Sequence, residues 1–550
     1  MPSPRSRLVL ICAAGVVLAT GLGLVAVRVA PQPAAVVAPP PTTAPASPSP
    51  STPSQPATEL TADGMRASWV VRENELAGSS GWRITHPPAA GFIDGFADQT
   101  YATTGQPVRV FVSTSARSFH VEAFRIGYYG GAGGRLIWES PDYRGGVQAK
   151  CPVTAGINMV SCANWTPSLT VHVTQGFPPG DYLLKLVGSG NEQGYVPLTV
   201  WDPASHATYL VKNDVFTWQA WNPYGGFDYY QGVGTCPPGV YPLCTRARVV
   251  TFDRPYADGH GAGDFLTMEA PLVRFLERDG LDVDYVTDMT VQDHPNVLSG
   301  HSVLLSLGHD ECWTFAERTA IQNANAKGMN VAFFGASAVL RHVRTQPSPL
   351  GDDREEVDFR DSAADPLNGK GNPKEVTGNT WGAPPANWPE DAFVGESYNG
   401  FLEPGVHAGL TVADPTAWIF KGTGLARGAT LPGVIASDVD SLEPVAAHPS
   451  DVQVLAHSPL PVRQADAATR NGQVFYSDMT YYTDPTSKAG VWDSGTNNWI
   501  PALAAGCRGP DCPATAMTAM TTNLLYLFGQ GPAGRQAPSR SNGRTYYPPG

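Results

Sequence analysis

Three ionisable side chains follow one another in the segment Gly308-His309-Asp310-Glu311, directly after an apolar run. An imidazole can transfer protons, and a carboxylate can bind a metal ion or orient the imidazole. His309 and Glu311 lie two residues apart in a turn that begins with glycine, so we expect both to face one crevice. The simpler interpretation is that Asp310 only caps the following helix, because aspartate is a preferred N-cap residue. The grouping of three ionisable residues favours a functional site over a cap.

A segment dense in aromatic residues, 212–230, offers a second kind of chemistry. We expect its tryptophans and Phe227 to pack in the core, because aromatic rings bury large apolar areas. Tyr229 and Tyr230 also carry hydroxyls that need partners. A phenol can become a hard anionic oxygen ligand, so a tyrosine together with Glu311 suits a highly charged metal ion better than zinc.

The elements around these residues alternate between strand and helix. Apolar periodicity and Gly stops predict helix 265–278, strand 281–286, buried strand 302–307, helix 314–326 and buried strand 330–334. Strands separated by helices form parallel sheets, whose ligands bind outside the carboxyl ends of the strands. Residues 308–311 and Gly335-Ala336-Ser337 each follow a strand directly, so we expect both at that edge.

Composition and residue patterns divide the chain into two folded domains, a spacer and a tail. Short alternating strands between Gly and Pro turns indicate a β-sandwich over residues 60–203, which precedes the α/β domain, 204–535, and a tail, 536–550. A spacer rich in Pro, Ala, Ser and Thr occupies residues 31–58 and cannot bury a core.

The first 30 residues determine the expected location. Arg5 and Arg7 precede an uncharged stretch, 8–27, that is long enough to cross a bilayer as a helix. This stretch is a signal peptide or a transmembrane anchor, and we favour a single anchor with the amino terminus in the cytoplasm. The remainder is then exported: it lies on the extracellular side of the cell membrane, or is secreted if the leader is cleaved.

Cysteine spacing agrees with export. Six cysteines form three near pairs in the sequence, which suit local disulfides outside the cell: Cys151 with Cys162, Cys236 with Cys244, and Cys507 with Cys512. Zinc-type ligand spacing is absent from the sequence. Cys312 is left unpaired, and one hypothesis makes it a nucleophile beside His309.

Charge and apolar content limit the classes of function. The chain has 550 residues and a formal net charge of −13 without a basic cluster, which disfavours nucleic acid as a partner. Hydrophobic residues make up 42% and charged residues 15%, so the chain can bury a large core. We therefore expect no nucleic-acid partner, and membrane contact only through the N-terminal segment. The oligomeric state stays open.

Several motifs occur in the order in which they occur in a known family. They are Phe124-Arg-Ile-Gly-Tyr-Tyr-Gly-Gly131, Thr217-Trp-Gln-Ala-Trp-Asn222, Phe252-Asp-Arg-Pro-Tyr256, Leu307-Gly-His-Asp-Glu311 and Ala332-Phe-Phe-Gly335. In these motifs the chain resembles the large (beta) subunit of N,N-dimethylformamidase and its bacterial relatives. The resemblance implies an immunoglobulin-like sandwich followed by a class I glutamine amidotransferase-like, flavodoxin-like α/β domain. This agrees with the fold class predicted from periodicity, all-β plus α/β.

The same resemblance implies a mononuclear ferric iron, Fe(III), held by two tyrosines and one glutamate. Carried over to this sequence, Glu311 is the glutamate and Tyr230 is one tyrosine. For the other tyrosine we choose Tyr182, with Tyr195 as the alternative.

The resemblance also implies the catalytic groups. His309 is the expected base or orienting group, Ser337 stands where relatives tend to have asparagine, and Asp438 stands where they tend to have glutamate. The resemblance implies an iron-dependent amidohydrolase that hydrolyses the C–N bond of a small amide with metal-activated water, and the leader adds the expectation that it is exported. The alternative is a non-catalytic cell-surface module that keeps the fold and binds a glycan or another ligand.

Overall fold

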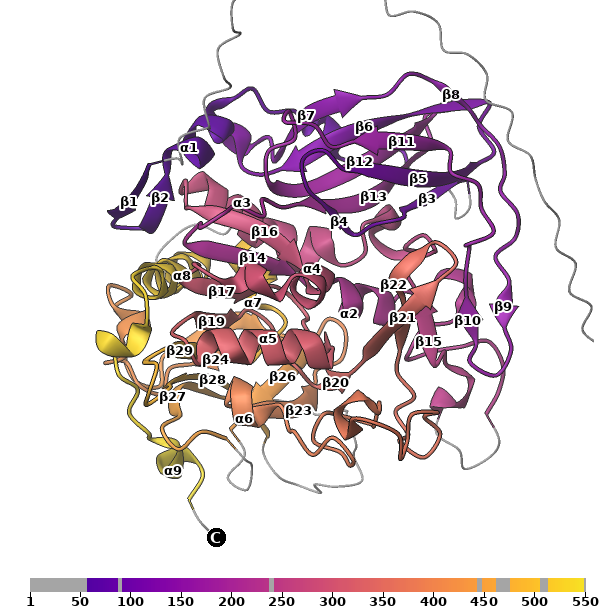
Figure 1. Cartoon of the computed structure of the whole chain (residues 1–550). Helices are drawn as coiled ribbons and strands as arrows, with labels where there is room; N and C mark the ends of the chain where they lie inside the picture. The colour runs from indigo at the N-terminus through magenta and orange to yellow at the C-terminus, as the bar shows by residue number, and fades with distance from the viewer. Residues whose placement is uncertain are drawn as a thin grey trace, which may run out of the picture. The chain divides into compact units, whose positions relative to one another are not determined.

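Alternating burial along the first strands builds a sandwich of two β-sheets. The computed structural model describes residues 57–87, 92–236, 242–442, 448–460, 475–504 and 513–548. One sheet has the strand order β11-β5-β3, and the other β4-β13-β12-β6-β7 with β8 beside β6 (Figure 1). The bounds are β3 (Ile93–Ala97), β4 (Tyr101–Ala102), β5 (Pro107–Thr114), β6 (Ser118–Ile126), β7 (Gly134–Glu139), β8 (Tyr143–Arg144), β11 (Leu169–His172), β12 (Gly180–Gly188) and β13 (Gln193–Val200).

Apolar residues of both sheets share one core, for example Val110 of β5, Val121 of β6 and Leu184 of β12. The short alternating strands predicted for this region are thereby confirmed. A hairpin and a helix precede the sandwich: β1 (Thr58–Thr61), β2 (Gly64–Ala67) and α1 (Ser68–Glu75).

A seven-stranded sheet with the order β16-β14-β17-β19-β29-β28-β27 forms the centre of the α/β part. The first five strands are parallel, as predicted, and β28 and β27 are added antiparallel at one edge. The bounds are β14 (Tyr209–Asn213), β16 (Val283–Thr287), β17 (Val303–Ser306), β19 (Asn330–Phe333), β27 (Gln453–Leu460), β28 (Phe475–Thr483) and β29 (Gly490–Asp493). Together the two parts confirm the all-β plus α/β composition.

Helices cover both faces of this sheet. Successive strand residues point to opposite faces, so Leu305 packs with one set of helices and Leu304 with the other. The first face carries α3 (Ala270–Arg278), α7 (Trp499–Ala504) and α8 (Pro513–Gly529), and the second carries α4 (Asp288–Asp293) and α5 (Phe315–Asn325). The strand and helix predicted at 302–307 and 314–326 match β17 and α5.

Two local predictions need correction. The N-cap of α5 is Thr314, which forms a capping box with Glu317, so Asp310 is not the cap. The helix predicted over 265–278 begins with a π-helical turn at Phe265–Glu269, and α3 starts only at Ala270. Pro271 lies in the first turn of α3, where its missing N–H costs nothing.

Short strands and helices form the remaining layer around the sheet (Figure 1). The strands pair as β9 (Val153–Thr154) with β10 (Met159–Val160), β15 (Val249–Thr251) with β22 (Gly351–Val357) and β21 (Arg344–Ser348), β18 (Cys312–Trp313) with β20 (Arg341–His342), β23 (Ser397–Phe401) with β26 (Asp438–Ser441), and β24 (Ala408–Thr411) with β25 (Thr430–Ile435). The short helices are α2 (Val215–Ala220), α6 (Asp391–Val394) and α9 (Gly543–Tyr546).

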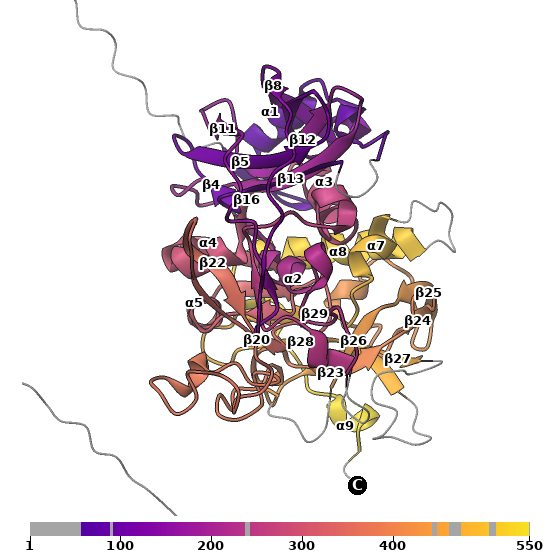
Figure 2. The same ribbon diagram turned by 90° about the vertical axis from the view of Figure 1, so that its right-hand side faces the viewer.

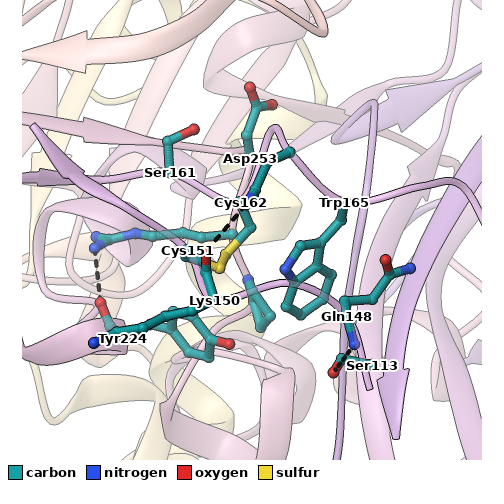
Figure 3. The surroundings of a disulfide bond; sticks show 12 residues. Ser113, Gln148, Lys150, Cys151, Ser161, Cys162, Trp165, Tyr224 and Asp253 are labelled. Atoms are coloured by element: carbon teal, nitrogen blue, oxygen red, sulfur yellow. Dashed lines mark hydrogen bonds between the residues drawn. A yellow bond between two sulfur atoms is a disulfide. The ribbon is translucent and has the colours of Figure 1, made fainter. Parts of the chain in front are cut away.

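Two of the three predicted disulfides are present. Cys151 bonds to Cys162 and Cys236 bonds to Cys244, whereas the pair Cys507 and Cys512 lies outside the described residues. Figure 3 shows Trp165 beside the first disulfide. The amide of Cys162 donates to the Asp253 carbonyl at 2.7 Å, so this disulfide lies where the segment between β8 and β11 meets the α/β part.

The predicted leader and spacer also lie outside the described residues. Within the described part of the chain, every helix is too short or too polar to cross a bilayer.

A buried ion pair joins the sandwich to α3. Arg125 of β6 donates to both carboxylate oxygens of Glu277, at 2.8 and 2.5 Å, and both side chains are fully buried. The Tyr285 hydroxyl donates to the same carboxylate at 2.6 Å. Figure 2 shows α3 alongside the sandwich strands. A bidentate arginine fixes the relative orientation of the two elements as well as attracting the opposite charge.

We predict that Arg125→Leu lowers the free energy of unfolding by about 3–5 kcal/mol, because it leaves the Glu277 carboxylate buried without its counter-ion. Urea unfolding measures this loss. The exposed Arg117→Leu is the matched control and is expected to change stability by less than about 0.5 kcal/mol. Equal stability of the two variants would contradict the role given to this pair.

Candidate functional site

The turns after β17 and β19 touch each other, and glycine makes this contact possible. Gly308 has a φ of +56°, a conformation that side chains other than glycine rarely adopt. A Cβ on Gly335 would lie 1.7 Å from the Gly308 carbonyl oxygen. The two segments predicted to share the carboxyl edge of the sheet therefore lie together, with His309 and Glu311 on one and Ser337 on the other.

A buried lysine organises the first turn. Lys212, at the end of β14, lies 2.7 Å from Asp310 and 2.9 Å from Glu317 and also contacts Asp288. Burial lowers the pKa of Lys212, but these carboxylates outweigh burial and raise it well above its usual range. Oxygen atoms of the three acids lie within 4.8 Å of one another, an arrangement that could hold a metal ion. Since the Lys212 ammonium lies among them, the acids already have a cation.

Asp310 consequently has a structural role. It accepts hydrogen bonds from the Ser306 hydroxyl at 2.5 Å and the Trp313 indole at 2.8 Å, in addition to its contact with Lys212. These three partners hold the backbone between β17 and α5, so that the residues on either side of Asp310 point elsewhere.

Glu311 lies at the centre of the candidate site. The Thr217 hydroxyl accepts hydrogen bonds from the amides of Glu311 and Cys312, both at 3.0 Å, and this anchors the loop to α2. One carboxylate oxygen accepts hydrogen bonds from the Tyr230 hydroxyl and from the Trp221 indole N–H, the latter at 3.1 Å. The other accepts from Arg341 Nε at 3.1 Å.

Neighbouring charges keep this carboxylate ionised. Burial alone would raise the pKa of Glu311, but the charges of Arg341 and His309 outweigh burial and lower it below its usual value. The pKa of the Tyr230 phenol changes in the opposite direction. Burial and the charge of Glu311 raise it well above its usual range. The pair is therefore a carboxylate that accepts from a neutral phenol.

Tyr230 is fixed between two side chains. The Trp221 ring stacks on one side with ring centroids 3.5 Å apart, and the Arg360 guanidinium lies 4.2 Å from the ring centroid. Cation–π contact and stacking restrict the phenol to one orientation. The predicted proximity of Tyr230 and Glu311 is thus present in the structure.

His309 lies beside this pair and next to Asp438. Its Nε2 is 3.3 Å from the Asp438 carboxylate and 3.7 Å from that of Glu311. Burial lowers the pKa of His309, but Asp438 and Glu311 raise it to about 9, so the imidazole is charged near neutral pH. The Ser337 hydroxyl donates to Asp438 at 2.7 Å. Asp438 therefore lies between the serine and the histidine, and Ser337 orients Asp438.

A polar cavity of about 310 Å³ opens in front of these residues. Its lining residues come from the aromatic segment and the residue after it, the loop before α3, the turn after β17 and the start of β26. They are Trp218, Trp221, Asn222, Gln231, Tyr256, Asp258, Gly263, Asp264, His309, Ser437 and Asp438. The predicted catalytic residues His309 and Asp438 thus face a space that a small molecule can enter.

The tyrosines proposed as the third iron ligand lie elsewhere. Tyr182 is buried in the sandwich core, where its hydroxyl donates to the Pro178 carbonyl at 2.7 Å. The Tyr195 hydroxyl donates to the Trp82 carbonyl at 2.6 Å. Both phenols occupy strands whose side chains pack inside or beneath the sandwich, so neither joins Tyr230. Of the ferric ligand set, the structure brings together one phenol and the carboxylate, and these two donors suit a hard cation.

Sequence reasoning missed the other groups around Glu311. Trp221 was expected only to pack, although it is 36% exposed, lines the cavity and donates to the carboxylate. Arg341 and Arg360 come from segments without a recognisable motif. Tyr398 also lies within electrostatic reach, because burial and the charges of Asp438 and Glu311 raise its pKa.

Cys312 does not fit the nucleophile hypothesis. It is fully buried and unpaired, and it packs in a core cluster with Tyr229. Burial and the charge of Glu311 raise the pKa of this thiol well above its usual value, whereas a nucleophilic thiol requires a lowered pKa.

The fold and this geometry define an α/β protein with a polar cavity at the carboxyl edge of its parallel sheet. A family model described as N,N-dimethylformamidase beta subunit-like, C-terminal, matches residues 120–513. The match covers most of the chain, and the protein belongs to this family. A search of curated proteins finds no match.

We predict that Lys212→Met lowers the free energy of unfolding by about 3–5 kcal/mol, because the three acids lose their buried cation. The loss should be smaller at pH 5 than at pH 8. Without the lysine the raised pKa values of Asp288 and Glu317 rise further, and acids with raised pKa values stabilise the folded state when protonated. Chemical unfolding at both pH values measures the effect, with the exposed Lys327→Met as control. A loss no larger than that of the control would contradict this role.

Proposed function

We propose that the protein is an amidohydrolase that cleaves the C–N bond of a small amide. The family assignment supports the class of reaction. The observation that carries the proposal is the convergence of Tyr230, Glu311, His309 and Asp438, of which His309 and Asp438 line the cavity. An imidazole between two carboxylates beside an accessible cavity is suited to moving protons at a reacting amide.

In this proposal, His309 holds a proton that it can give to the departing amine nitrogen. Asp438 keeps the imidazole oriented and charged, and Ser337 keeps Asp438 in place through its hydroxyl. Arg341 and Trp221 hold the Glu311 carboxylate toward Tyr230. These contacts preorganise the charges before a substrate enters, which reduces the rearrangement needed during reaction.

We further propose that Tyr230 and Glu311 hold ferric iron. Phenolate and carboxylate are hard anionic donors that match this ion, and the two side chains already meet. Such an ion, when bound, supplies Lewis acidity that polarises an amide carbonyl and acidifies water. Since Tyr182 and Tyr195 both lie elsewhere, neither supplies the second tyrosine ligand that the resemblance implies.

Export is part of the proposal. The two disulfides are supporting observations, since disulfides persist mainly outside the cytoplasm. An anchor over residues 8–27 would place the cavity on the extracellular side.

Metal analysis and visible spectroscopy test the iron site. We expect about one iron per chain and a phenolate-to-iron charge-transfer band for the purified wild-type protein. Tyr230→Phe keeps the ring stack but removes the hydroxyl, so it should lose the band, and Glu311→Gln should lose the iron. Tyr229→Phe is the matched control, because the Tyr229 hydroxyl donates to the Glu356 carbonyl instead. Iron-free wild-type protein from iron-replete cells would refute the site.

The hydrolytic role is tested by His309→Gln. Removal of a positioned acid typically costs about 10²–10⁴-fold in rate, so kcat for amide hydrolysis should fall by that factor while bound metal is unchanged. A panel of small amides with detection of the released amine measures this. Absence of hydrolysis across the panel by metal-loaded wild-type protein would instead favour a ligand-binding module.

A further inference from the structure

The cavity in front of His309 has aromatic walls. Trp218, Trp221 and Tyr256 line it, and the Trp218 and Tyr256 rings contact each other edge to face with centroids 6.0 Å apart. Two buried acids fix the Trp218 ring, because its indole N–H donates to Asp214 and Glu269, both at 2.7 Å. Gly263, which has no side chain, leaves the space beside this ring open.

Carboxylates dominate the charge of the lining. Asp258, Asp264 and Asp438 line the cavity, whereas His309 is the one cationic side chain among the described lining residues. Asp438 is partnered by Ser337 and His309. The carboxylates of Asp258 and Asp264, in contrast, receive neither a hydrogen bond nor an ion pair from the described residues.

The position of Asp264 is not explained by a hydrogen bond that stabilises the fold. It stands at the N-cap of the turn Phe265–Glu269, but its side chain caps nothing. It is partly buried beside the cavity, and burial raises its pKa while the charge of His309 lowers it. A partly buried carboxylate that receives no hydrogen bond costs free energy, and a paired cation reduces this cost. His309, the cationic residue of the lining, is shared with Asp438 and Glu311, so a cation that enters with the ligand can supply the charge that Asp264 lacks.

We propose that the substrate carries a positively charged amine, which binds between the Asp258 and Asp264 carboxylates and the aromatic rings of Trp218, Trp221 and Tyr256. An ammonium gains from both surroundings, by ion pairing and by attraction to the electron-rich faces of the rings. The amide of the same molecule then lies toward His309 and Asp438. This placement of the amide rests on the proposed hydrolysis, whereas recognition of the cation does not.

Two nearly isosteric amides test this inference. N-acetylputrescine ends in an ammonium, and N-pentylacetamide ends in a methyl group at the same position. Titration calorimetry at low ionic strength and neutral pH should show at least about tenfold tighter binding of the amine. Asp264→Asn should remove this preference, and the more exposed Asp258→Asn should reduce it. Glu403→Gln, an exposed acid outside the cavity lining, should leave it unchanged.

The outcomes separate this inference from the proposed function. Equal affinity for the two amides, or no binding of either, overturns the inference. A preference for the amine without cleavage of either amide supports cation recognition and refutes hydrolysis. Cleavage of both amides with equal KM supports hydrolysis and refutes cation recognition. Should Asp264→Asn fail to fold, Asp258→Asn and the wild-type comparison still decide the question.

Discussion

The buried ammonium of Lys212 is the interaction on which the rest of the site depends. It lies at the carboxyl end of β14, where β14 has neighbours on both sides, and it draws together acids from three separate segments: Asp288, Asp310 and Glu317. None of these charges could be buried alone at a tolerable cost. The cluster therefore forms as a unit, and its formation sets the path of the chain from β17 into α5.

From this cluster the geometry of the site follows. With Asp310 directed inward, His309 and Glu311 project toward the cavity side of the turn, where Thr217 holds the backbone amides. The short parallel pairing of β18 with β20 then brings Arg341 to the Glu311 carboxylate. Glu311 thus contacts a cation, a phenol and an indole from two other segments: the cation from β20, and the phenol and the indole from the aromatic segment 212–230. Such a carboxylate is held in one place by its partners.

The sequence predicted the framework well because the framework depends on local patterns. Apolar runs and Gly stops located β17, α5 and β19, and the edge on which functional groups gather follows from parallel topology alone. The proximity of Tyr230 and Glu311 came from the resemblance and is present in the structure. The sequence favoured a site at residues 308–311 over a cap at Asp310, but a local pattern cannot reveal that Asp310 pairs with a lysine about a hundred residues earlier. Tyr182 was the wrong choice of ligand because a strand pattern does not show whether a tyrosine packs inside the sandwich or reaches the α/β part. The cavity carboxylate Asp264 gave no signal, since its neighbours in space are distant in sequence.

The central claim is that one phenol and one carboxylate, held by the turn after β17, form the metal-binding centre of the cavity. Anomalous diffraction at the iron absorption edge, from crystals of iron-loaded protein, tests it most directly. The account predicts a single strong peak between the Tyr230 hydroxyl and the Glu311 carboxylate. A peak among Asp288, Asp310 and Glu317, or protein crystals without any iron peak, would contradict it.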